Sequence, residues 1–354
     1  MDIRERIEAA ERQSLAPGAA LAEKSAGRAV AEAPHPFRTA FMRDRDRILH
    51  CKAFRRLAHK TQVFVAPEGD HHRVRLTHTL EVAQVARTIA RALKLNEDLA
   101  EAICLGHDLG HTPFGHLGEE VLADFLGRPF RHNAQSLRIV DCLEVRRVEV
   151  RGLEGGPGPS EEPRPEPGLN LTAEVRDGIL NHTWSMPLPS TLEGEVARFA
   201  DRIAYLSHDI DDALRAGVLE VAGLPAVTRK VLGSTPSAQI DTMVGSVINS
   251  SATSPPNQKI EMAPDVFEAM LETRSFMFAK VYSRPELRDE QLRLAALLRE
   301  LLDHFEAQRD ELPQGGMESD FQTRLIDYVA GMTDRFALRE HARLVEGSPD
   351  ARKD

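Results

Sequence analysis

Hydrophobic residues recur every three or four positions over most of the 354-residue chain, a spacing typical of amphipathic helices. One face of the segment 78–93 carries Val82, Val85, Ala86, Ile89 and Leu93. The same spacing predicts helices within residues 41–65, 99–105, 121–125, 134–140 and 192–214. It also predicts several helices within residues 264–345, two of which cover 291–305 and 320–344. Few segments alternate as strands do, and no internal repeat is visible. The pattern therefore predicts an all-α fold.

Two helix ends are marked by their own residue types. Asn96 precedes the helix that runs through Leu105, and asparagine is a preferred N-cap. Gly217 follows the helix 192–214 at the position where a left-handed glycine often ends a helix. Since His107 and Asp108 come directly after Leu105, we expect them at the C-terminal end of their helix.

Composition divides the chain into three parts. Residues 1–35 are rich in Ala, Glu and Arg and are interrupted by a Pro-Gly pair, so we expect a flexible N-terminal arm. Residues 36–225 are predicted to form the core, with a loose Pro- and Glu-rich insertion at 150–168. Residues 226–354 are predicted to form a C-terminal helical region packed on that core, with a second loose loop at 234–256.

Charge and cysteine usage exclude several classes of protein. The net charge of −10 argues against a protein dedicated to coating nucleic acid. No apolar run is long enough to span a bilayer and no secretory signal is visible, so no membrane partner is expected. The three cysteines show no CxxC spacing, which indicates reduced thiols and a cytoplasmic location.

A local basic surplus stands out in this acidic chain. Residues 38–75 contain ten lysines and arginines against four acids. Such a segment suits a polyanionic small ligand, especially a phosphate chain. A solvated helix face with internal ion pairs explains the same composition equally well.

The segment His107–Glu119 brings three histidines and two carboxylates into thirteen residues. A neighbouring His-Asp pair offers imidazole and carboxylate ligands to a divalent cation, and further histidines could handle protons beside it. A second pair, His208-Asp209, lies within a predicted helix, where successive side chains point about 100° apart and converge poorly on one ion. His107 and Asp108 are therefore the favoured metal pair.

A polar stripe marks the helix 192–214. Asp201, Tyr205 and Asp209 are spaced four residues apart and share one face, while apolar residues occupy the flanks. This arrangement could line a polar cavity inside a bundle, or it could face solvent.

Several long motifs carry a resemblance to a known family. They are Arg43–His50, Ala53–Val63, Arg75–Val82, Gly106–Glu119, Arg131–Ser136, Gly168–Thr172, Ala200–Asp212 and Ala330–Ala337. Over about residues 34 to 345 the chain resembles the HD-domain superfamily, and more closely the bacterial dNTP triphosphohydrolases of the dGTPase type. Two features depart from the pattern, the long stretch before Gly168 and Gly194-Glu195 where Ala-Gln is expected.

The resemblance implies an HD-domain helical bundle with additional C-terminal helices and a set of site residues. The metal ligands would be His78, His107, Asp108 and Asp201, holding a divalent ion (Mn, Mg, Co, Fe or Zn). The catalytic group would be His116, oriented by Glu119, with His111 as a phosphate contact. A capping or loop-ordering role is the alternative for each of these histidines.

The resemblance also implies substrate contacts. Gln62 would contact the deoxyribose 3′-hydroxyl, and Arg75 would contact the phosphate or the sugar. Tyr205 and Asp209 would pack against the sugar. Asn133 and Gln135 would contact either the phosphate or the side chains that surround the metal. A helix-bridging role is the alternative for Asn133 and Gln135.

Together these features predict a metal-dependent enzyme that converts deoxynucleoside triphosphates to deoxynucleoside and tripolyphosphate. The alternatives are an HD phosphohydrolase acting on nucleoside monophosphates or cyclic nucleotides, and a metal-bearing module that binds single-stranded DNA or a protein. The resemblance further implies a homo-oligomer, tetramer or hexamer, with dNTPs acting as activators in some members.

Overall fold

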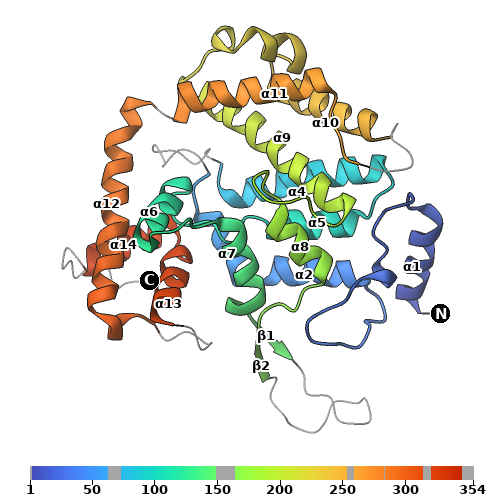
Figure 1. Cartoon of the computed structure of the whole chain (residues 1–354), viewed down its shortest axis with the longest axis horizontal. Helices are drawn as coiled ribbons and strands as arrows, with labels where there is room; N and C mark the ends of the chain where they lie inside the picture. The colour runs from blue at the N-terminus through green and yellow to red at the C-terminus, as the bar shows by residue number, and fades with distance from the viewer. Residues whose placement is uncertain are drawn as a thin grey trace.

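The computed structural model describes residues 2–62, 73–148, 164–252, 259–282, 284–313 and 320–344, and it confirms the all-α prediction (Figure 1). The α-helices in these ranges are α1 (Ile3–Ser14), α2 (Ala40–His50), α3 (Lys52–Arg56), α4 (Arg75–Ala92), α5 (Glu97–Gly106), α6 (His116–Leu126), α7 (His132–Arg138), α8 (Ala173–Asn181), α9 (Leu192–Arg215), α10 (Pro236–Ala252), α11 (Pro264–Met277), α12 (Pro285–Ala307), α13 (Phe321–Ala330) and α14 (Asp334–Leu344). The strands described are one short antiparallel pair, β1 (Val145–Val148) and β2 (Arg164–Pro167).

The larger hydrophobic core forms around α4, α5 and α9, with α2 and α8 packed against α5 (Figure 1). The Asn96 side chain accepts a hydrogen bond from the backbone N–H of Leu99 (3.2 Å), so α5 begins where the sequence predicts. Helix α9 ends before Gly217, whose φ of +67° confirms the predicted glycine stop. None of the helices in the described ranges has the length and apolarity to cross a membrane.

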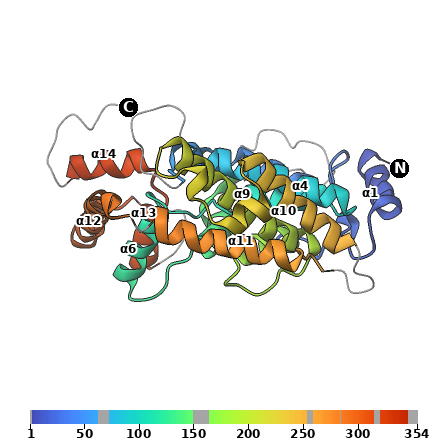
Figure 2. The same cartoon turned by 90° about the horizontal axis from the view of Figure 1, so that it is seen from above.

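A second, separate core joins α6 to the C-terminal helices. Phe114, Val121 and Leu122 pack with buried residues of α12, α13 and α14 rather than with the first core. Figures 1 and 2 show these helices together at one end of the molecule, with α1 at the other end. Helices α10 and α11 pack on α9 and contribute to the first core.

The expected flexible arm instead lies against the body of the protein. Helix α1 begins with a capping box between Asp2 and Glu5. The side-chain amide of Asn96 donates a hydrogen bond to Glu11 in this helix (3.2 Å). Further along, the backbone N–H of Ala20 donates to the buried carboxylate of Glu193 (3.0 Å). The hydrogen-bond partners of the arm lie 85 and 173 residues away along the chain, so the composition of the arm itself does not show that it is anchored.

Three other expectations need correction. The segment 41–65 is not one helix, because Cys51 adopts extended backbone between α2 and α3 and its sulfur accepts from the N–H of Phe54 (3.3 Å). The expected loose loop 234–256 contains helix α10, whose Met243 and Val247 are buried. The expected helix 320–344 is broken into α13 and α14. Residues 150–163 of the proposed insertion lie outside the described residues.

Helices α5 and α8 approach closely through a reciprocal exchange of glycine and isoleucine. A Cβ atom at Gly178 would lie 2.4 Å from Cδ1 of Ile103, and one at Gly106 would lie 2.5 Å from Cδ1 of Ile179. Both isoleucines are fully buried, so they have little room to move. Since Gly106 directly precedes His107, this close contact fixes the position at which His107 and Asp108, the favoured metal pair, follow helix α5.

Gly178→Ala should lower the free energy of unfolding by about 1–3 kcal/mol, because the added methyl overlaps a buried side chain. Urea denaturation of the variant measures this loss. Gly223→Ala is the matched control, since a Cβ there meets nothing within 4 Å; its change should stay within about 0.5 kcal/mol. Equal stability of the two variants would contradict the close approach.

Candidate active site

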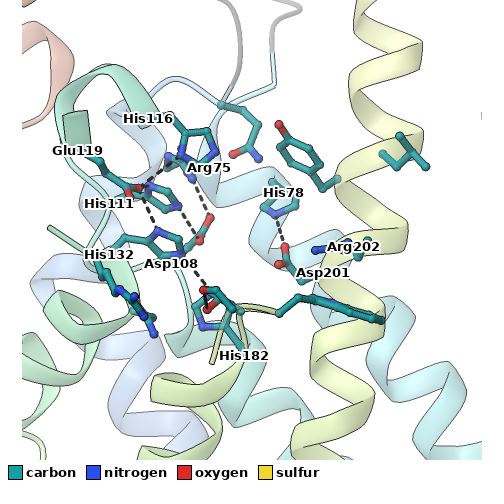
Figure 3. A pocket seen from close by; sticks show the side chains of 18 of the residues that line it. Arg75, His78, Asp108, His111, His116, Glu119, His132, His182, Asp201 and Arg202 are labelled. Atoms are coloured by element: carbon teal, nitrogen blue, oxygen red, sulfur yellow. Dashed lines mark hydrogen bonds and ion pairs between the residues drawn. The ribbon is translucent and has the colours of Figure 1, made fainter. Parts of the chain in front are cut away.

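A cavity of about 410 Å³ opens where the two cores meet. Helices α4 and α9 form one wall, and the loop after α5, helix α6 and the start of α7 form the other (Figure 3). Its lining contains most of the residues that the sequence singled out, namely Gln62, Arg75, His78, Asp108, His111, His116, Glu119, Asn133, Asp201 and Tyr205. Residues separated by up to 140 positions thus share one polar space.

Four of the predicted metal ligands converge at the inner end of this cavity. Nε2 of His78 lies 3.3 Å from Oδ1 of Asp201. Nε2 of His107 lies 3.3 Å from Oδ1 of Asp108 and 3.6 Å from Oδ1 of Asp201. The donor atoms of His78, His107 and Asp108 lie within 4.8 Å of one another.

The ring of His107 is oriented toward this centre. Its Nδ1 donates to the carbonyl of Cys104 (2.5 Å), while its buried Nε2 has no hydrogen-bond partner among the described residues. A histidine ligand whose other nitrogen bonds a backbone carbonyl is a common arrangement at metal sites. The donor set of two imidazoles and two carboxylates therefore fits a divalent cation.

The electrostatics of the centre also favour a cation. Burial would lower the pKa of His107, but the carboxylates of Asp108 and Asp201 raise it to about 9. Burial would likewise raise the pKa of both acids, yet their imidazole neighbours hold it well below the ordinary value. The two carboxylates therefore stay ionised and need a positive charge between them.

Glu119 lies at the middle of a histidine cluster rather than in a simple pair with His116. Its Oε1 lies 2.8 Å from Nδ1 of His111 and 3.0 Å from Nδ1 of His132, but 3.7 Å from Nδ1 of His116. The His111 and His132 rings are stacked, with centroids 3.9 Å apart. Burial opposes ionisation of Glu119, while His132 and His111 hold its pKa well below the ordinary value.

His111 links this cluster to the metal centre. Its Nε2 lies 3.1 Å from Oδ1 of Asp108, while its Nδ1 faces Glu119 (Figure 3). Burial, together with the positive charges of Arg75 and His132, lowers the pKa of His111 to about 4. A neutral His111 has a single N–H, so it can donate to only one of the two carboxylates at a time, Asp108 or Glu119. His116 differs, because its side chain is 62% exposed toward the open side of the cavity.

Two further histidines, His132 and His182, belong to the site although neither was predicted as a site residue. His182 Nε2 lies 3.2 Å from Nε2 of His132, and the ring stacks edge-on against His107 at 5.0 Å. His182 also forms a possible ligand group with His107 and Asp201. His132 stands inside the motif Arg131–Ser136, which could have revealed it; His182 follows α8 outside any quoted motif.

The predicted substrate residues are placed unequally. Gln62 lines the cavity, and its buried Oε1 has no partner in the described part of the chain. Arg75 also lines it, but its Nη1 donates to Oδ2 of Asp108 (2.9 Å). Tyr205 faces the cavity, whereas Asp209 lies behind it and accepts a hydrogen bond from the hydroxyl of Tyr282.

The side chains of Asn133 and Gln135 join helix α7 to neighbouring helices, which is the alternative role expected for them. The Asn133 amide donates to the carbonyl of Leu180 (2.5 Å), which ties α7 to α8, although the residue still lines the cavity. The Gln135 amide donates to Asp327 on α13 (2.9 Å). Gln135 is not among the cavity-lining residues.

Most of the basic segment is used for internal contacts. The pairs are Arg38 with Asp46, Arg43 and Arg47 with Glu32, Arg45 with Asp98, and Arg73 with Asp212. Of the basic segment, Arg75 lines the cavity, and further positive charge there comes from Arg131, Arg202 and Arg274. Burial and the neighbouring Arg274 lower the pKa of Arg202 to about 10, and its guanidinium stacks 4.4 Å above the Trp184 ring.

Comparison with known proteins agrees with this geometry. Residues 75–206 match the HD domain, and residues 260–343 match a phosphohydrolase-associated domain. A deoxyguanosinetriphosphate triphosphohydrolase-like protein of Caldanaerobacter subterraneus subsp. tengcongensis is 47% identical over 99% of this chain and 97% of its own length. A protein of the same name from Desulfatibacillum aliphaticivorans is 45% identical over 99% of both chains.

Among solved structures, a phosphohydrolase from Bacteroides thetaiotaomicron shares the fold with a TM-score of 0.50 and 16% identity, over 86% of this chain and 69% of its own. The matched HD segment begins at Arg75 and ends just after Tyr205, so it contains all four converging ligands. The chain therefore belongs to the deoxyguanosinetriphosphate triphosphohydrolase-like family of HD-domain phosphohydrolases.

Proposed function

We propose that the protein hydrolyses deoxynucleoside triphosphates at the α-phosphorus, releasing the deoxynucleoside and inorganic tripolyphosphate. The observation that carries this proposal is one cavity with three kinds of surface. His78, Asp108 and Asp201 form the inner end, with His107 directly behind them against both carboxylates. The Glu119 histidine cluster forms one wall, and Arg202 and Arg274 stand on another. The names of the family relatives support the same substrate class.

A divalent ion held by His78, His107, Asp108 and Asp201 would supply Lewis-acid activation of water and of a phosphate oxygen. The side chains around it have their own tasks. Arg75 fixes the orientation of Asp108 through its 2.9 Å hydrogen bond. Arg202 and Arg274 bring positive charge to the phosphate chain, because guanidinium groups match phosphate oxygens in geometry and charge.

Proton transfer falls to the histidine cluster. His116 faces the open cavity and can approach a bound substrate, while Glu119 orients the imidazoles beside it. His132 shares Glu119 with His111, so we propose it as a third member of this group. Their close packing keeps Glu119 ionised, as a partner for a protonated imidazole must be.

The sugar would lie against Tyr205. An aromatic ring beside C2′ leaves no room for a ribose hydroxyl, which favours a deoxynucleotide. Gln62 offers an unpartnered amide oxygen to the 3′-hydroxyl. Asp209, behind the cavity wall, would act through Tyr282 and Tyr205 rather than by direct contact. The native metal, the oligomeric state and activation by dNTPs stay predictions.

Product analysis tests the bond that is cleaved. The protein loaded with Mn²⁺, Mg²⁺ or Co²⁺ should convert dNTPs to deoxynucleoside and tripolyphosphate, and chelation should abolish turnover. Ion-exchange chromatography separates the products. Monophosphate with pyrophosphate would show cleavage between the α- and β-phosphates instead of between O5′ and the α-phosphorus, and would reject the assigned bond. Turnover confined to nucleoside monophosphates or cyclic nucleotides would reject the substrate class. Salt-dependent DNA binding without any turnover would favour a binding module.

His116→Ala should lower kcat by about 10²–10⁴-fold, the range typical for loss of a general acid or base. His132→Asn should lower kcat less, because it reaches the substrate through Glu119. Both variants should retain the metal affinity of the wild type, measured by isothermal titration calorimetry. His304→Asn on the distant helix α12 is the control for histidine replacement. A loss of metal affinity in His116→Ala would make His116 a ligand instead.

A further inference from the structure

The two halves of the site belong to different hydrophobic cores. His78, His107 and Asp201 stand on helices α4, α5 and α9 of the first core, whereas Glu119 stands on α6, which packs on α12 in the second core. The distance between the metal ligands and the proton-transfer residues is therefore set across the boundary of the two cores. Contacts between the two cores must therefore fix the position of α6 relative to α4, α5 and α9.

Two buried charged side chains meet at this boundary. Nζ of Lys60 donates to the carbonyl of His111 and to the carbonyl of Ala330 (2.9 Å) at the end of α13. Asp334, in the first turn of α14, accepts from the backbone N–H of Phe114 (3.0 Å) and of Thr61 (2.8 Å). Both side chains are at least nine-tenths buried.

These four bonds join three segments that are far apart in sequence. They are residues 60–62, which end in Gln62; the loop 111–115, which leads into His116; and the C-terminal segment 330–334. Each oxygen of Asp334 serves a different segment, Oδ1 the loop and Oδ2 the residue before Gln62. The C-terminal helices thus touch both the proton-transfer side and the proposed sugar side of the cavity through one carboxylate.

The loop itself needs such support. Phe114 has a φ of +61°, the left-handed region that is costly for a residue with a Cβ. Its N–H is held by Asp334, and its ring is buried in the second core. The N-terminal turn of α14 favours the negative charge of Asp334. Backbone held in an unfavourable conformation by buried contacts is a common device for placing functional side chains.

We propose that Lys60 and Asp334 are positioning residues, which lock the loop 111–115 to the C-terminal helices and thereby hold His116 and Glu119 at a set distance from the metal ligands. The proposal rests on the proposed function in assigning proton transfer to His116 and Glu119. Neither residue reaches the cavity lining, so both act through the backbone of the loop. The role of the phosphohydrolase-associated region would be to complete the site geometry.

Asp334→Asn tests the proposal, because it keeps the shape of the side chain and turns one acceptor into a donor that faces a backbone N–H. We expect kcat to fall about 10- to 100-fold, as misplacement of a catalytic group by about an ångström does. KM should change less, and the affinity for Mn²⁺ should stay within twofold of the wild type. Hydrogen exchange at the amides of Phe114 and Thr61 should accelerate.

Glu300→Gln is the matched control. It removes the negative charge of Glu300 on α12, which lies 2.7 Å from His341 on α14, on helices of the second core but away from the loop. Its kcat and the exchange of the Phe114 amide should match the wild type. If Asp334→Asn does not fold, Lys60→Met offers the same test from the other side of the boundary, with the same expected pattern.

Wild-type kcat and wild-type amide exchange in a folded Asp334→Asn protein would overturn the proposal. A parallel loss of Mn²⁺ affinity, or an equal loss of kcat in Glu300→Gln, would also overturn it, since either would indicate general loosening. If the wild type itself hydrolyses no dNTP, the proposed function fails, while amide exchange and Mn²⁺ affinity still decide whether Asp334 locks the loop.

Discussion

Asp108 and Asp201 both lie against Nε2 of His107 at the inner end of the cavity, at 3.3 and 3.6 Å, and both stay ionised. Burying two carboxylates together is costly unless positive charge and hydrogen bonds accompany them. In this chain the surroundings are three imidazoles, those of His78, His107 and His111, and the guanidinium of Arg75. This requirement for a compensating cation explains why helices from distant parts of the sequence converge on one point, and why the site suits a metal-dependent hydrolase.

The scaffold around this centre divides the work between two cores. The first core is tightly interlocked, as the close approach of α5 and α8 shows, and it carries the proposed metal ligands. The second core carries α6 with His116 and Glu119. Such a division lets one part of the chain fix the cation while another places the groups that move protons. Precision then depends on the loop between them, which explains the buried lysine and aspartate at that boundary.

Much of this could be predicted from local sequence. The 3.6-residue spacing placed α4, α5 and α9, and the Asn96 cap and Gly217 stop were correct. The His107-Asp108 pair was preferred over His208-Asp209 on helix geometry. In the structure Asp108 lines the cavity and Nε2 of His107 lies 3.3 Å from it, whereas His208 and Asp209 are not among the described residues that line the cavity. Long family motifs added His78 and Asp201, which no local pattern would have joined to that pair.

The failures have a common cause, which is dependence on distant partners. His132 and His182 gain their place only because α7 and the end of α8 fold beside His111 and His107. The basic segment looked like a phosphate site, yet its arginines pair with acids such as Glu32 and Asp98. Helix α10 looked like a loop by composition, because its Ser and Thr residues hid the buried face that packs on α9.

The most direct test of the central claim is anomalous diffraction from crystals of the protein grown with Mn²⁺. The account predicts one strong anomalous peak, with His78, His107, Asp108 and Asp201 as its protein ligands at about 2.0–2.6 Å. A peak bound by His182 or His132 in place of His78 or Asp201 would contradict it. So would the absence of any peak at this centre under conditions that support turnover.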